Sequence, residues 1–187
     1  MLAVLGEPHD PALDPALRHA VAAAAGSWAA ATAGPGLAFA STAVEGAGAA
    51  GTQPFAEPGP EAVAAALGDL LAGHDGPVIL VAADVPRLDA ALAAGALGDI
   101  AAGCALAFAP ATDARPFLLA LAAPTPEALA LVGGRDRHRD EVFAAAMALG
   151  GEVGLLRSER RLVTPADARA LALDPLAPAA LRALAEG

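Results

Sequence analysis

The fold is decided by residues 77–89, which read PVILVAADVPRLD. The first part, 77–83, is an unbroken apolar run rich in β-branched residues, which is typical of a strand buried on both faces. Asp84 follows the run directly, and Asp89 is of a type that caps helix N-termini. The stretch therefore predicts a buried strand, a turn that carries a carboxylate, and a helix.

The same alternation of short apolar runs and longer Ala- and Leu-rich runs extends along the chain. Strands are expected at residues 2–5, 37–42, 77–83, 104–109, 116–121 and 152–156, and helices at 15–33, 61–72, 89–102, 141–149, 164–173 and 176–185. Strands that alternate with helices indicate an α/β fold. We expect one three-layer domain over residues 1–187, with a mainly parallel sheet flanked by helices.

The composition restricts the partners of this chain. Its 187 residues include 21 acidic and 11 basic residues, and the formal net charge is -10. This charge argues against non-specific nucleic acid binding and against docking on anionic membranes. The single cysteine, Cys104, excludes a disulfide framework. We find no secretory signal and no convincing membrane span, so we expect a cytoplasmic protein, and its Ala-rich, weakly aromatic surface permits a homodimer.

Two carboxylates are the first candidates for chemistry. In open α/β sheets ligands bind beyond the carboxyl ends of the strands, which is where Asp84 falls. Asp84 could hold a metal or a ribose hydroxyl, or it could only cap the turn before Pro86. Asp113 lies between two predicted strands, where a turn role is the default, and Arg115 beside it could bind an anion or pair with Asp113.

Positive charge gathers in two later stretches. Residues 135–140 read RDRHRD, and a second group consists of Arg157, Arg160 and Arg161. Either group could bind a phosphate, and from the first we select Arg139 as a candidate nucleotide contact. Alternating Arg and Asp could equally neutralise each other on a solvated surface. Residues 164–167, TPAD, resemble a helix capping box with Asp in place of Glu.

Common catalytic motifs are absent from the sequence. It contains no phosphate-binding glycine loop, no nucleophile elbow and no zinc-ligand spacing among its four histidines. We interpret Cys104, at the start of an apolar strand, as inert core, and Trp28 as a core anchor.

The order of the remaining pieces resembles a known family. The order begins with a strand ending in Ala-Asp-Val-Pro, followed by a helix and by residues 107–121 (AFAPATDARPFLLAL). A later strand is followed by TPADA at residues 164–168. This order is similar to that of the uncharacterised bacterial glycosyltransferase-A-type proteins of the nucleotide-diphospho-sugar transferase superfamily. Molybdenum cofactor guanylyltransferases and phospholactate guanylyltransferases are more distant relatives. The resemblance is clearest over residues 76–173.

The resemblance implies roles for particular residues. Asp84 matches an aspartate expected to contact a metal or the nucleotide sugar, so Mg²⁺ or Mn²⁺ would be the cofactor of an active enzyme. Asp113 matches a residue expected near the acceptor, as a base or an orienting group. The implied partner is a nucleotide or a nucleotide sugar, and Arg115, Arg139 or Arg161 would replace missing phosphate cations.

The sequence also departs from the family pattern. Arg161 and Val163 stand where the family has two acids, and the loop at residues 6–11 (GEPHDP) is acidic where relatives are basic. Two hypotheses follow. The chain is a divergent glycosyltransferase-like or nucleotidyltransferase-like protein with eroded metal and phosphate motifs, or it is a non-catalytic module that binds a ligand or a partner.

Overall fold

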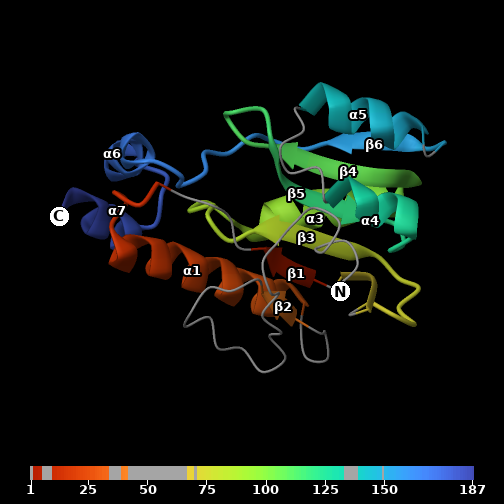
Figure 1. The fold of residues 1–187 in the computed structure, drawn as a ribbon, viewed down its shortest axis with the longest axis horizontal. Coiled ribbons are helices and arrows are strands. Elements are labelled where there is room, and N and C mark those ends of the chain that lie inside the picture. Colours follow the sequence, from red (N-terminus) through yellow and green to blue (C-terminus); the bar gives the residue numbers. More distant parts are fainter. Residues whose placement is uncertain are drawn as a thin grey trace.

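The structure is a computed structural model of the chain (Figure 1). It describes residues 2–5, 10–33, 39–41, 67–69, 71–132, 139–148 and 150–187. The acidic loop at residues 6–9, the predicted loop 45–59 and the Arg-rich residues 135–138 lie outside this set. Of the helix expected at 61–72, residues 67–69 are helical and residues 61–66 lie outside the described part.

Six strands form one sheet in the order β2-β1-β3-β5-β4-β6. The strands are β1 (Leu2–Leu5), β2 (Phe39–Ser41), β3 (Val78–Ala82), β4 (Cys104–Pro110), β5 (Pro116–Leu121) and β6 (Glu152–Leu155). β5 is antiparallel to both of its neighbours, and all other pairings are parallel. The expected mainly parallel sheet is thus confirmed. The strand order reverses next to β1, which lies between β2 and β3.

Helices cover both faces of the sheet, which gives three layers. The helices of the described residues are α1 (Pro15–Ala33), α3 (Ala90–Ala101), α4 (Pro126–Val132), α5 (Arg139–Ala148), α6 (Pro165–Leu173) and α7 (Ala179–Glu186). α1 and α3 pack on one face, against a cluster that includes Ile79 and Val81. α4 and α5 pack on the other, against Val78 and Leu80. Because β3 is covered on both faces, its run is apolar at every position.

A third cluster joins the first half of α1 to the two C-terminal helices. Leu13, Leu17 and Val21 pack there against Leu162 and Leu171 of the C-terminal region. α6 begins at the predicted capping box, since the Thr164 side chain accepts from the backbone of Asp167 and the Asp167 side chain accepts in return. α7 begins at Ala179, later than the predicted residue 176, because Pro178 occupies the N-cap position.

Two further differences from expectation concern α4 and Cys104. The helix α4 was not expected from the sequence, and it begins at Pro126, two residues after Pro124. Cys104 begins β4 but is only half-buried, because the first two residues of that strand lie outside the core. Desolvation and the nearby charges of Asp99 and Glu152 raise the pKa of the Cys104 thiol, which favours its protonated form.

The expectation for Trp28 is confirmed. Its ring packs against the core cluster beneath α1 and α3, and its indole Nε1 donates to the carbonyl of Asp89 at 2.8 Å. Asp89 is the N-cap of α3, as predicted, and its side chain accepts from the amide of Leu92. Within the described ranges, the structure shows no helix of sufficient length and apolarity to cross a bilayer.

Candidate functional site

The candidate site lies at the edge of the sheet where β3 and β4 end. Both strands run in the same direction, so Asp84 after β3 and Asp113 in the β4–β5 turn meet at one edge. β6 also ends there, and the chain that follows it, residues 156–163, is called the edge segment below. Figure 1 shows this segment between β6 and α6.

Backbone hydrogen bonds fix the edge segment along these strand ends. The amide of Leu156 donates to the carbonyl of Phe108 in β4 at 2.9 Å, and the amide of Leu162 donates to the backbone carbonyl of Asp84 at 2.7 Å. The amide of Asp10, in the loop after β1, donates to the carbonyl of Val163 at 2.8 Å. The edge segment therefore crosses from β4 past β3 to the chain that leaves β1. The register of these bonds decides which of its side chains reach Asp84.

Arg161 is the side chain that reaches Asp84. Its Nε donates to both carboxylate oxygens, at 3.1 Å to Oδ1 and 3.0 Å to Oδ2, and its Nη2 donates to Oδ2 at 2.8 Å. The side chains of Arg161 and Asp84 are only 7% and 14% exposed. Two arms of one guanidinium thus hold both oxygens of a carboxylate that is largely shielded from water.

Opposing effects act on the ionisation of Asp84. Burial raises the pKa of its carboxyl, and the charge and hydrogen bonds of Arg161 offset only part of this rise, so the pKa stays above its usual range. The charge of Asp113 adds a further upward push on the pKa of Asp84. The two site residues selected from the sequence thus lie at the same end of the sheet, Asp84 largely shielded after β3 and Asp113 exposed in the β4–β5 turn.

A second group of charges surrounds Glu159, a buried residue of the edge segment. Arg157 Nε donates to Glu159 at 2.8 Å, and Arg87 Nη1 lies 3.4 Å from the other carboxylate oxygen. Arg157 also lies 2.9 Å from Asp89 at the start of α3, and Arg87 lies 3.5 Å from Asp174. This group fastens the edge segment to the turn after β3 and to the end of α6.

The β4–β5 turn holds Asp113 at the surface. Asp113 is exposed, and its Oδ1 accepts from the amide of Arg115 at 3.1 Å, while the amide of Ala111 donates to the carbonyl of Arg115 at 2.6 Å. Ala114 adopts a left-handed conformation with φ of 66°. The structure therefore confirms the turn geometry, and it leaves the carboxylate of Asp113 facing solvent beside the Asp84–Arg161 pair.

The structure gives different outcomes for the other residues that the sequence suggested for the site. Arg139 is the first residue of α5, and its side chain lies outside the described residues, so its contact with a nucleotide stays a prediction. Arg161 was considered from the sequence as a phosphate cation, and the structure places it on Asp84 instead. Glu159 and Arg87 were missed. A lone acid between Arg157 and Arg160, just past a predicted strand, was the only signal for Glu159.

These donors do not fit the divalent cation that the resemblance implies. Mg²⁺ prefers near-octahedral oxygen coordination, and both oxygens of Asp84 already accept hydrogen bonds from Arg161. Among the described residues, no group of three or more His, Cys, Asp or Glu side chains is placed to hold a metal ion. A cation at this edge would have to displace the guanidinium.

Arg160, next to Arg161, makes a pair whose pH dependence is testable. Its Nη1 donates to Asp167 at 3.0 Å, and Asp167 also accepts from the hydroxyl and amide of Thr164. Burial raises the pKa of Asp167, but the bonds from Thr164 and Arg160 outweigh burial, so the pKa lies below its usual range. Charged Asp167 therefore stabilises the folded chain.

We expect the stability difference between the wild-type protein and Asp167→Asn to depend on pH. A lowered folded-state pKa contributes stability that is complete well above the unfolded value of about 3.9 and is lost as the pH falls through the folded-state pKa. The difference in unfolding free energy between the two proteins is measured in urea from pH 7 downward. It should stay constant at first and then become smaller in acid. A difference that grows on acidification would contradict this assignment.

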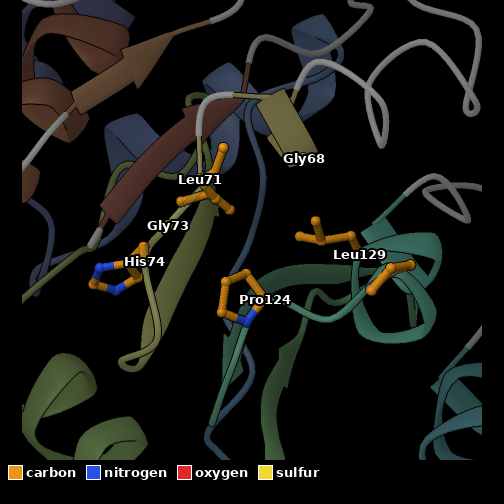
Figure 2. Close-up of a pocket in the computed structure, with 8 residues that line it drawn as sticks. Gly68, Leu71, Gly73, His74, Pro124 and Leu129 are labelled. Atoms are coloured by element: carbon orange, nitrogen blue, oxygen red, sulfur yellow. The ribbon is translucent and has the colours of Figure 1, made fainter.

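A pocket of about 480 Å³ lies at the opposite edge of the sheet. Figure 2 shows Leu71 and His74, before β3, on one side and Pro124 and Leu129 on the other. Val78 at the start of β3 pairs with Leu121 at the end of β5, so this pocket lies at the end of β3 away from Asp84. Its lining is mainly apolar, with no carboxylate and no Arg. The pocket is large enough to hold a ligand, but it lacks the charged side chains that a phosphate or a metal would need.

Comparison with known proteins places the fold. No protein-family model matches the sequence, and no curated protein matches it. Among solved structures, the chain is similar to a "putative nucleotide-diphospho-sugar transferase" from Desulfovibrio desulfuricans G20, with a TM-score of 0.67 and 14% sequence identity. The match covers 99% of this chain and 93% of that one. At this identity the likeness shows the fold alone: this chain has a nucleotide-diphospho-sugar transferase-like α/β fold.

Proposed function

We propose that this protein is a divergent member of the transferase-like fold that binds a nucleotide or a nucleotide sugar at the carboxyl edge of β3 and β4. The observation that carries the proposal is the meeting of Asp84, Asp113 and the Arg-bearing edge segment at this edge. The edge adjoins the point beside β1 where strand order reverses, which is where open α/β sheets bind ligands.

Different charged groups at this edge would bind different parts of the ligand. The guanidinium of Arg161 is paired with Asp84, and Arg87 and Arg157 are paired with Glu159, Asp174 and Asp89. Arginine favours the negative charge of a diphosphate, so a bound diphosphate would compete with these carboxylates for the arginines. Asp113 presents an exposed carboxylate that can accept hydrogen bonds from ribose or sugar hydroxyls. In an active transferase the same carboxylate would be the base or orienting group for the acceptor. Arg115 and Arg139 are further proposed phosphate contacts.

A non-catalytic binding module is the second candidate. It is favoured by the state of Asp84, whose two oxygens are both taken by Arg161 and so do not face a ligand freely. Transfer of a sugar or a nucleotidyl group requires stabilisation of the leaving diphosphate, which in this site would fall to arginine alone. The two candidates share ligand binding and differ in turnover.

A thermal-shift screen tests ligand binding. The probes are UDP, GDP, ADP, CDP, GTP, UDP-glucose and GDP-mannose, each with Mn²⁺ and with EDTA. A ligand at about 1,000 times its dissociation constant stabilises the folded state by about 4 kcal/mol, so a true ligand gives a clear rise in melting temperature. We expect at least one probe to do so, whereas no rise with any probe would sink the proposal. A rise confined to GTP would favour the guanylyltransferase-like relatives.

Matched variants locate the binding. Asp113→Asn and Arg115→Ala should weaken the shift, because both residues lie in the β4–β5 turn at the proposed site. The control is Asp75→Asn, which removes an exposed carboxylate near the amino end of β3, at the opposite edge. Equal losses in Asp113→Asn and Asp75→Asn would place the ligand elsewhere. Release of free sugar or of pyrophosphate from a bound probe would separate the transferase from the binding module.

A further inference from the structure

We infer that the guanidinium of Arg161 takes the cation position beside Asp84, so that ligand binding at this edge is independent of divalent metal. The inference deepens the proposed function and rests on the same site. It begins from a disagreement: the family resemblance in the sequence implies a metal, and the described residues do not fit one.

The first argument is the geometry of Asp84. A carboxylate ligates a cation through its oxygen lone pairs, and here both oxygens accept from Arg161 at 2.8 to 3.1 Å. The pair is nearly excluded from water, with Arg161 7% exposed and Asp84 14% exposed. If a metal displaced the guanidinium from Asp84, Arg161 would stay buried without its counter-charge, which is strongly unfavourable.

The second argument is the state of the surrounding carboxylates. Glu159 is buried between Arg87 and Arg157, and Asp167 is held by Arg160 and by the N-terminus of α6. A divalent site would need several such oxygens pointing at one centre. Each of these two acids is instead paired with arginine, and among the described residues no three or more acids, histidines or cysteines are placed to share a metal ion.

The third argument is that the backbone builds the pair. The amide of Leu162, the residue after Arg161, donates to the carbonyl of Asp84 at 2.7 Å. The amide of Thr112 in the β4–β5 turn donates to Glu159 at 3.0 Å. These two bonds fix the register of the edge segment on either side of Arg161. The guanidinium is therefore held against Asp84 before any ligand arrives, in the position that a cation would otherwise take.

The test uses Mn²⁺ alone, without nucleotide, and amide NMR signals of the full chain. Bound Mn²⁺ broadens the signals of nearby amides, so it reports where a cation sits even in an acidic protein with weak surface binding. In the wild-type protein we expect no selective broadening of Asp84, Asp113 and Leu162 at substoichiometric Mn²⁺. Selective broadening of these three signals would overturn the inference.

A charge-reversal variant gives the positive half of the test. Arg161→Glu sets a second carboxylate beside Asp84, and we expect it to gain Mn²⁺-dependent broadening at these amides and a rise in melting temperature with Mn²⁺. Arg160→Glu is the control, because it makes the same charge change at a neighbour that pairs with Asp167. If Arg161→Glu is unfolded without metal, recovery of its native spectrum on adding Mn²⁺ supports the inference. No response of Arg161→Glu to Mn²⁺, folded or unfolded, would overturn it.

The result of the Mn²⁺ experiment can be distinguished from the result that tests the proposed function. The Mn²⁺ experiment contains no nucleotide, so it stands whether or not the thermal-shift screen finds a ligand. When a probe does bind, its melting-temperature shift should be the same with Mn²⁺ as with EDTA. A shift that requires Mn²⁺ would leave the ligand site in place and would refute metal independence.

Discussion

Replacing Arg161 with Ala is expected to lower the free energy of unfolding by about 3–5 kcal/mol. The substitution leaves Asp84 partly buried with no guanidinium to compensate its charge. Removal of one partner from such a buried pair is far more costly than the loss of an exposed one, because the remaining charge stays in a poorly solvated place. Urea unfolding, followed by circular dichroism at neutral pH, measures the change.

Arg160→Ala is the matched control for this prediction. Arg160 is the adjacent residue, has the same side chain and also pairs with an aspartate, but it is 51% exposed. Its loss should cost about 0.2–1 kcal/mol, as for other exposed pairs. Equal effects of the two substitutions would mean that the Asp84–Arg161 pair is solvated. That result would contradict the conclusion that this pair is buried. Replacing both members of the pair, as Asp84→Leu with Arg161→Met, should recover much of the loss.

Phe108→Ala is the second substitution with a large expected effect, a loss of about 3–5 kcal/mol in unfolding free energy. Phe108 is fully buried in β4, in the cluster beneath α4 and α5, and its truncation leaves a cavity between the sheet and these helices. Urea unfolding again measures the change. The prediction matters for the site because the carbonyl of Phe108 also anchors the edge segment at Leu156.

Phe143→Ala serves as the comparison for Phe108→Ala. Phe143 lies on α5 and is 44% exposed, so its removal takes far less apolar surface out of the core. We expect a change of less than about 1 kcal/mol, as for most surface substitutions. If Phe143→Ala were as destabilising as Phe108→Ala, α5 would have to be buried against something that this chain does not provide.

Local patterns in the sequence predict much of this fold. The buried strand at residues 77–83 corresponds to β3 (Val78–Ala82), and α1 and β5 have the expected bounds. The capping box at Thr164 was predictable because its partners are three residues apart. The helix α4 was not, because its short run begins at Pro126, just after Pro124, and prolines also mark turns.

The site was predictable only in part, and the reason is sequence distance. Asp84 was found because it directly follows a recognisable strand, and Asp113 because a turn separates two strands. The Asp84–Arg161 pair joins residues far apart in the chain, and its existence depends on how the edge segment lies across three strand ends. No periodicity in the sequence encodes that register. From the sequence, the three arginines of the edge segment could bind a phosphate or be neutralised by acids at the surface, and in the fold each has a carboxylate partner.

The measurement that tests the central claim most directly is an NMR titration of the wild-type protein with UDP and with GDP in EDTA. The account predicts that at least one of them shifts the amide signals of Thr112, Arg115 and Leu162, at the carboxyl edge of the sheet. The signal of His74, in the pocket at the opposite edge, should stay in place. Shifts confined to the region of His74, or no shift with either nucleotide, would contradict the account.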